Sequence, residues 1–280
     1  MHINFLLEVF RENLDAEAMV WKNTTVSYAW LLERFDFWCA DLEAKKVKPG
    51  TVVVILGDYS PNSIALLLAL IQKCCIIIPL TVLNEAKRNE YIEVGMSEAC
   101  FTMDADDNAT FTTFDRRAEH EHYACLRDNG HPGLVLFSSG STGAGKAAVH
   151  DFARLLEKYK VRRQNLRTLT FLLYDHIGGV DTMLYSLRNG SCIIPVQDRL
   201  PDTVCKAIQD NKVDVLPVSP SFLNMLILSE AYARYDLSSL KYITYGAEVM
   251  PETTLKKCTE LFPGVTLLQQ GVLKHRAQRR

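Results

Sequence analysis

Two short apolar runs with a helix between them constrain the fold of this chain most. Val52 to Leu56 is a β-branched run short enough to be a buried strand, and Ile76 to Ile78 is a second such run. Between them, Ser60-Pro61 is typical of a helix cap with proline in the first turn, and it opens an apolar helix through Leu70. Because a strand, a helix and a strand at this spacing need a crossover connection, the two strands are predicted to be parallel.

The same alternation extends on both sides of this unit. Ser27 precedes a segment with apolar residues at helical spacing, and Pro49-Gly50 ends it. Residues 84–132 show a weak pattern, and we interpret DADDN and DRRAEHEH there as solvated loop or surface helix without a function. Further strands are expected at 134–137, 191–196, 213–218 and 240–244, with helices at about 150–160, 203–209, 221–229 and 251–261. The chain is therefore predicted to be α/β, with layered sheets and helices.

Composition excludes several classes of function. With 280 residues and a net charge of -2, the chain is an ordinary globular protein with no electrostatic case for binding nucleic acid or an anionic membrane. The start carries Glu8, Glu12 and Asp15, unlike a signal peptide, and Gln72-Lys73 interrupts the most apolar segment, so no membrane span is expected. Eight cysteines without a C-x-x-C pair indicate neither zinc nor a disulfide framework. We expect a cytoplasmic protein with a small-molecule partner, and its oligomeric state stays open.

The segment FSSGSTGAGKAAVH, residues 137–150, follows an expected strand and is typical of a phosphate-binding loop. From Gly140 to Lys146 it satisfies the spacing G-x-x-x-x-G-K of the P-loop NTPases. That motif needs a hydroxyl directly after the lysine, because this oxygen holds the magnesium ion. Here the residue is Ala147, whose methyl group cannot coordinate a metal. A P-loop NTPase is therefore disfavoured, but the loop alone leaves it open.

A second interpretation of this segment also makes it a phosphate-binding loop, but in a different class of enzyme. Hydroxyl groups can donate to an anion, glycines let backbone N–H groups approach it, and Lys146 adds positive charge for the outer phosphates. The segment resembles the signature loop of the adenylate-forming enzymes, which include acyl- and aryl-CoA synthetases, luciferase and peptide-synthetase adenylation domains, with the pattern [YFT]-[ST]-S-G-[ST]-T-G-x-P-K-G. Gly145 and Ala147 depart from the usual proline and glycine. The matching residues that we expect to bind the nucleotide are Ser138, Ser139, Gly140, Ser141, Thr142, Gly143 and Lys146.

Other segments resemble this superfamily in the same order. Residues 26–56 and 60–80 are similar to its first helices and strands, and YDHIGGVDTMLYSLRNGSCIIP resembles the segment that lines the acyl pocket. YGAEVMPETTLKKCTELFPGVTLLQQ resembles the adenine-binding stretch, which places Gly246, Ala247 and Glu248 beside the adenine. Tyr245 stacks on a base or simply packs, and the sequence does not decide between them. The resemblance implies that His176 borders the acyl group, with a purely structural histidine as the alternative.

The resemblance implies a reaction in two steps. A carboxylate attacks the α-phosphorus of ATP, giving an acyl-adenylate and pyrophosphate, and a thiol such as that of coenzyme A then accepts the acyl group. The implied substrates and cofactors are a small carboxylic acid, ATP, Mg²⁺ and coenzyme A, and the implied activity is that of an acid–thiol ligase. Lys146 and His176 are the expected catalytic residues, and Ser138 is the expected contact to the metal. The alternative is a protein of the same fold that binds a nucleotide or acyl group without catalysis.

The last residues depart from the superfamily's pattern. We expect residues 1–270 to form an incomplete N-terminal AMP-binding domain and residues 271–280 to form a divergent tail. Where the superfamily reads Y-G-x-T-E, this chain has GVLKHRAQRR after Gln270, without the carboxylate that binds the metal. We also expect the barrel subdomain and the C-terminal lid domain with its lysine to be missing. The expectation is a truncated or frameshifted enzyme whose adenylation is impaired.

Overall fold

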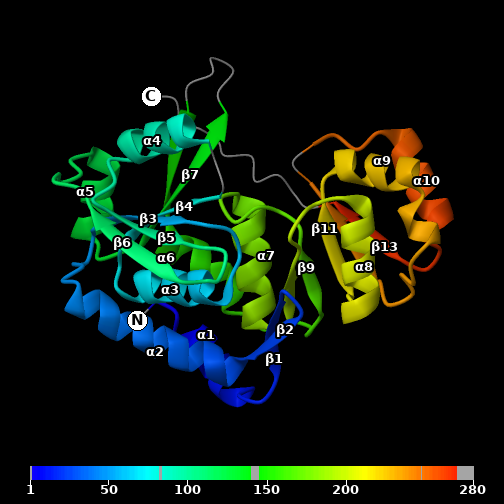
Figure 1. Ribbon diagram of the computed structural model, residues 1–280, viewed down its shortest axis with the longest axis horizontal. Coiled ribbons are helices and arrows are strands. Elements are labelled where there is room, and N and C mark those ends of the chain that lie inside the picture. Colours follow the sequence, from blue (N-terminus) through cyan, green and yellow to red (C-terminus); the bar gives the residue numbers. More distant parts are fainter. Residues whose placement is uncertain (1, 82–83, 140–144, 247, 270–280) are drawn as a thin grey trace. The chain divides into compact units, whose positions relative to one another are not determined.

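The computed structural model describes residues 2–81, 84–139, 145–246 and 248–269 (Figure 1). The chain forms two compact units. Unit 1 comprises residues 1–165 and 173–192, and unit 2 comprises residues 166–172 and 193–280. The expected α/β architecture is confirmed, because each unit combines helices with a sheet of mainly parallel strands.

Helices and strands alternate along most of unit 1. Its helices are α1 (Asn4–Glu12), α2 (Tyr28–Ala44), α3 (Pro61–Gln72), α4 (Glu85–Val94), α5 (Glu121–Asp128), α6 (Phe152–Leu156), the 3₁₀ turn η1 (Glu157–Tyr159) and α7 (Ile177–Arg188). Its strands are β1 (Glu17–Trp21), β2 (Thr24–Ser27), β3 (Val52–Leu56), β4 (Ile76–Leu80), β5 (Ala99–Met103), β6 (Ala109–Thr113), β7 (Gly133–Ser139) and β8 (Gly145–Asp151).

The main sheet of unit 1 has the strand order β6-β5-β3-β4-β7-β8. Strands β5, β3, β4 and β7 are parallel, while β6 and β8 run antiparallel to β5 and β7. The register pairs Val52 with Ile76, which confirms the strand–helix–strand unit expected from the sequence. Because ligands of open α/β sheets bind beyond the carboxyl ends of the strands, this edge of the sheet is where a site is expected.

Helix α3 supplies much of the core. The Ser60 hydroxyl accepts from the Ser63 amide at 3.2 Å, while the Ser63 hydroxyl accepts from the Ser60 amide at 2.9 Å, and Pro61 fills the first turn, as the sequence predicts. Nearly every residue of this helix is buried, because its sequence is apolar on all sides. In Figure 1, α3 and α2 lie on one side of the sheet and α4 lies on the other.

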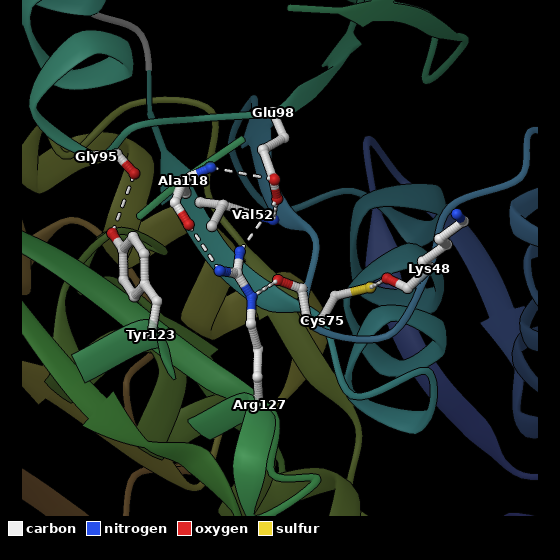
Figure 2. Close-up of polar contacts among 9 residues, drawn as sticks. Lys48, Val52, Cys75, Gly95, Glu98, Ala118, Tyr123 and Arg127 are labelled. Carbon is white, nitrogen blue, oxygen red and sulfur yellow. Dashed lines mark hydrogen bonds and ion pairs between the residues drawn. The ribbon is translucent and has the colours of Figure 1, made fainter. Parts of the chain in front are cut away.

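A polar network holds the amino ends of the same strands (Figure 2). The Glu98 carboxylate, just before β5, accepts from the Val52 amide at 2.6 Å and the Ala118 amide at 3.2 Å. Arg127 of α5 donates to the Ala118 carbonyl at 2.6 Å and the Gly50 carbonyl at 2.9 Å, and pairs with Glu98 at 3.5 Å. The network therefore ties α5 to the start of β3, at the end of the sheet opposite the expected site.

Residues 84–132 correct the sequence interpretation. They are not merely loop and surface helix, because they contain β5 and β6 as well as α4 and α5. DADDN forms the turn of the β5–β6 hairpin, in which Asp107 adopts a left-handed conformation with φ of 67°. Strand β6 escaped detection because it is largely exposed and rich in threonine, so it shows no apolar run.

Unit 2 is a smaller α/β layer. Its elements are β9 (Thr168–Thr170), β10 (Ile193–Pro195), α8 (Pro201–Asn211), β11 (Val215–Val218), α9 (Pro220–Ser229), the 3₁₀ turn η2 (Ala231–Ala233), β12 (Tyr242–Tyr245), α10 (Glu252–Leu261) and β13 (Thr266–Gln269). The strands lie in the order β13-β12-β11-β9-β10 and all run parallel. Strands β9 and β13 were not predicted, whereas the other strands and the α-helices lie within a few residues of their expected positions. No helix in the described part of the chain is long and apolar enough to cross a bilayer.

Candidate nucleotide-binding site

The glycine-rich segment lies in a β-hairpin of unit 1. Strands β7 and β8 pair antiparallel, with Ser138 opposite Lys146 and Phe137 opposite Ala147. Side chains of directly opposed residues share a face of the sheet, so the Ser138 hydroxyl and the Lys146 ammonium project from the same side. Both residues are exposed. One hydroxyl and one cation are therefore presented together where β7 ends, at the carboxyl edge of the sheet.

The opposite face of the hairpin is anchored to α4. The Phe137 ring stacks on the ring of Tyr91 with centroids 4.0 Å apart and an interplanar angle of 8°. The Lys87 ammonium covers the Tyr91 ring at 5.0 Å from its centroid. Because side chains alternate along a strand, this packing turns Phe137 inward and directs Ser138 the other way.

This geometry overturns the P-loop alternative. A P-loop is followed by a helix whose N-terminus carries the lysine and the metal-binding hydroxyl. Here Lys146 and Ala147 lie in strand β8 instead. The strand–loop–strand arrangement is therefore wrong for a P-loop NTPase, in agreement with the methyl group of Ala147.

Several expected contacts lie outside the described residues. Gly140, Ser141, Thr142 and Gly143 belong to this group, as does Ala247 in unit 2. Ser139 lies at the end of β7, opposite Gly145.

His176 lies at the start of α7 in unit 1, where it is the N-cap residue and is exposed. Its carbonyl accepts from the Gly179 and Val180 amides, both at 3.0 Å. The neighbouring Asp175 carboxylate accepts from the Thr81 hydroxyl at 2.5 Å and the Thr81 amide at 3.1 Å. Thr81 directly follows β4, which neighbours β7 in the sheet. The structure therefore brings His176 and the β7–β8 hairpin to the same carboxyl edge of unit 1.

Close packing fixes the first turn of α7. A Cβ added at Gly179 would lie 1.9 Å from the Leu173 carbonyl oxygen, so only glycine fits there. Tyr174 is fully buried, and its hydroxyl donates to the Ser63 carbonyl at 3.2 Å. Burial raises the pKa of the Tyr174 phenol, which keeps it protonated as a donor. The close packing of Gly179 and the burial of Tyr174 therefore fix the backbone that carries the exposed imidazole of His176.

The third expected segment follows β12 in unit 2. Gly246 and Glu248 lie beyond the carboxyl end of this strand, which is flanked by β11 and β13. The Glu248 carboxylate accepts from the Ser221 hydroxyl at 2.6 Å and the Ser221 amide at 3.1 Å, in the first turn of α9. A carboxylate is favourable at a helix N-terminus because it faces the positive end of the helix dipole. Glu248 therefore joins the turn after β12 to the start of α9.

Tyr245 is the last residue of β12 and is 8 % exposed. Its side chain is therefore buried, which fits the packing role that the sequence left as one of two alternatives. The contacts at Thr81, Asp175 and Ser221 were not anticipated, although a polar residue directly after an apolar strand, as at Thr81, is a usable signal.

The oxygen ligands of the described residues could hold a magnesium ion only together with the phosphates of a bound nucleotide. Within the described residues, no group of three or more His, Cys, Asp or Glu side chains could hold a metal. Mg²⁺ commonly takes one or two protein oxygens and completes its shell with water and substrate phosphates. The exposed Ser138 hydroxyl suits that arrangement, in which the ion would offset charge on the phosphates.

Comparisons with known proteins agree with this geometry. The model of the AMP-binding enzyme family matches residues 7–271, and the chain belongs to this family. The chain is 21% identical to D-alanine–D-alanyl carrier protein ligase of Bacillus cereus (strain AH187), over 92% of this chain and 55% of that protein. It is 28% identical to 4-coumarate–CoA ligase-like 9 of Arabidopsis thaliana, over 49% of this chain and 26% of that protein. The chain thus spans about half the length of the D-alanine ligases that it matches.

The fold is also found among solved structures. The luciferase-like enzyme from the nonluminescent mealworm Zophobas morio superposes with a TM-score of 0.78 and 19% identity. The match covers 98% of this chain and 72% of that one. The resemblance to the adenylate-forming enzymes that the sequence indicated is confirmed by the family match and this shared fold.

Proposed function

We propose that this chain takes part in ATP-dependent activation of a small carboxylic acid and its transfer to a thiol. The observation that carries the proposal is the β7–β8 hairpin, which presents Ser138 and Lys146 side by side within a chain of the AMP-binding enzyme family. In the first step a carboxylate oxygen bonds to the α-phosphorus of ATP while the bond to pyrophosphate breaks. In the second step a thiol sulfur takes the acyl group and AMP leaves.

Control of negative charge is the main physical demand of the first step, since an anion attacks a polyanion. Donors and cations fixed before the reaction stabilise the charge that collects on the leaving pyrophosphate. We assign this role to Lys146 and to the hydroxyls and amides from Ser138 to Gly143, with a magnesium ion at Ser138. Gly246, Ala247 and Glu248 are assigned to the adenine, and His176 to the border of the acyl group.

The thiol acceptor has two candidates. The printed names of the relatives include a carrier-protein ligase and a CoA ligase-like protein, so they support a thiol of either kind. The acid is likewise undetermined among short, long-chain, aryl and amino acids. We expect the reaction to take place in the cytoplasm, where reduced thiols and ATP are abundant.

An exchange assay tests the proposal. The chain is incubated with ATP, Mg²⁺, labelled pyrophosphate and one acid at a time from a panel of carboxylic and amino acids. Label entering ATP in the presence of one acid supports acyl-adenylate formation. ATP binding by calorimetry without exchange for any acid favours the non-catalytic binding protein instead. Release of inorganic phosphate without pyrophosphate would contradict both.

A further inference from the structure

A groove in unit 1 lies away from the candidate nucleotide site. It is formed by α2, the first turn of α3 and the β5–β6 hairpin, and has a volume of about 390 Å³. This is within the range of roughly 300–1,000 Å³ that is typical of small-molecule sites. Strands β3 and β4 separate β5 from β7, so the groove is about 14 Å from the β7–β8 hairpin by strand spacing alone.

Aromatic side chains form the walls of the groove. Phe37 is 49 % exposed, whereas Trp38 is buried and contacts the Phe101 ring edge-on with centroids 5.6 Å apart. The Trp38 indole N–H donates to the Asn62 side-chain oxygen at 3.1 Å, which fixes the indole. Phe111 completes the wall on the β6 side. The groove thus offers rigid apolar surface together with one accessible ring.

Two carboxylates line the groove, and each has one buried oxygen that forms no hydrogen bond of normal geometry with the described residues. Asp107 is 7 % exposed, and its Oδ2 accepts from the backbone N–H of Asn62 at 2.8 Å. Its Oδ1 is buried and, among the described residues, accepts no hydrogen bond of normal geometry; the same holds for Asp41 Oδ2. A buried acceptor without a donor costs about 1–3 kcal/mol. Because both carboxylates line the groove, their negative charge would attract a cationic group there.

Burial also affects the charge of Asp107. Desolvation raises the pKa of this carboxyl, while the nearby Ser60 hydroxyl, the Asn62 groups and the Arg34 charge oppose the shift. A positively charged donor in the groove would favour the ionised form of Asp107. Binding of an ammonium group and ionisation of the carboxyl would therefore support each other.

The groove also holds positive charge. The Arg34 guanidinium stacks on Phe37 at 4.9 Å and on Trp30 at 5.2 Å from the ring centroids. No carboxylate in the described part of the chain forms an ion pair with it. Lys45, by contrast, pairs with Asp41 Oδ1 at 2.5 Å. Arg34 is therefore available to bind a carboxylate in the planar, two-pronged manner of guanidinium groups.

We propose that this groove binds a small zwitterion, an α-amino acid or a close relative with an apolar or aromatic side chain. Its carboxylate pairs with Arg34, its ammonium lies beside the carboxylates of Asp107 and Asp41, and its side chain lies against Phe37 and Trp38. Both signs of charge are needed, because the two cations repel a simple amine and the two carboxylates repel a simple acid. The proposal does not depend on the function proposed above.

Calorimetric titration of the whole chain tests the proposal with matched probes. Phenylalanine, tyrosine and leucine carry both charges, phenethylamine lacks the carboxylate, and 3-phenylpropionate lacks the ammonium. At least one of the three amino acids is expected to bind, and about tenfold more tightly than the singly charged probes. The absence of binding by all three up to about 10 mM, or equal binding of phenethylamine, overturns the proposal.

Variants locate the site. Phe37→Ala and Arg34→Gln change accessible side chains and are expected to weaken amino acid binding about tenfold or more, with thermal melting as the check on folding. Arg117→Gln, at an exposed position outside the groove, is the matched control and leaves the affinity unchanged. Lys146→Ala also leaves it unchanged if the groove is distinct from the nucleotide site. Unaltered binding by both groove variants, or loss of binding in Lys146→Ala, contradicts the proposal.

Discussion

Ser138 and Lys146 occupy directly opposed positions on β7 and β8, so a hydroxyl and an ammonium project from one face of a single hairpin. The lysine of a P-loop belongs to a helix, whereas here the antiparallel pairing alone sets its distance from the serine. Two groups held in this way can contact the same anion. The stacking of Phe137 on Tyr91 holds the other face of the hairpin and limits its rotation.

Lys146→Ala is expected to weaken ATP binding far more than AMP binding. The proposed contact is to the outer phosphates, which AMP lacks, and a hydrogen bond to a charged group is worth about 1.5–3 kcal/mol. This corresponds to a loss of roughly tenfold or more in ATP affinity by calorimetry. Lys48→Ala, at an exposed lysine near the amino ends of the strands, is the control and should change neither affinity. Equal weakening for both nucleotides would remove Lys146 from the outer phosphates.

Arg127→Met is expected to destabilise unit 1 by about 2 kcal/mol, because the Glu98 carboxylate keeps its buried position but loses its cation. Both side chains are largely buried, at 19% and 14% exposure. The Ala118 and Gly50 carbonyls lose their donor in the same variant. The measurement is the urea midpoint of unfolding followed by circular dichroism.

An exposed ion pair provides the comparison for Arg127. Arg116 donates to both oxygens of Glu93 at 2.6 and 2.8 Å, but Glu93 is largely exposed. Arg116→Met should therefore shift the urea midpoint much less than Arg127→Met. Equal shifts in the two variants would show that the Glu98–Arg127 network contributes no more than a surface pair.

The sequence predicted the elements whose apolar pattern is strong. Strands β3 and β4 are buried on both faces, and α3 carries a proline and a capping serine. The apolar composition and the helix-capping residues therefore predicted the same three elements. The β1–β2 hairpin was missed because its turn consists of Lys22 and Asn23, with φ of 47° and 62°, in place of the glycine that usually marks such a turn. Strand β6 was missed because it is mostly exposed.

The sequence indicated candidate site residues only where they belong to a motif. Lys146 and His176 were predicted from a resemblance to known motifs, and the structure places them in β8 and at the start of α7. The bond from Thr81 to Asp175 joins residues 94 positions apart, so no local pattern reveals it. The contact between Ser221 and Glu248 likewise depends on two strands of unit 2 ending at the same edge.

Cys125 is expected to be the one cysteine that reacts rapidly with a thiol reagent such as DTNB at pH 8. All eight cysteines are free, and Cys125 alone is exposed. Burial raises the pKa of Cys75 and of Cys205 to about 12, so about one in ten thousand of these groups is a thiolate at pH 8. Cys125→Ser should abolish the fast phase, while unfolding in urea exposes the remaining thiols. A fast phase that persists in this variant would contradict the burial pattern.

Variants of Glu248 can distinguish a role of this residue in nucleotide binding from a role in folding. Because its carboxylate accepts from the Ser221 amide and hydroxyl, Glu248→Ala should destabilise the start of α9 by about 0.5–1 kcal/mol, whereas Glu248→Gln keeps an acceptor and changes stability less. If the turn after β12 contacts the adenine, Glu248→Ala also weakens ATP and AMP by the same factor, unlike Lys146→Ala. Glu252→Ala, at an exposed acid in the first turn of α10, is the control for a helix N-terminus without a nucleotide role. Unchanged nucleotide affinity in Glu248→Ala, together with lowered stability, would assign this glutamate to α9 alone.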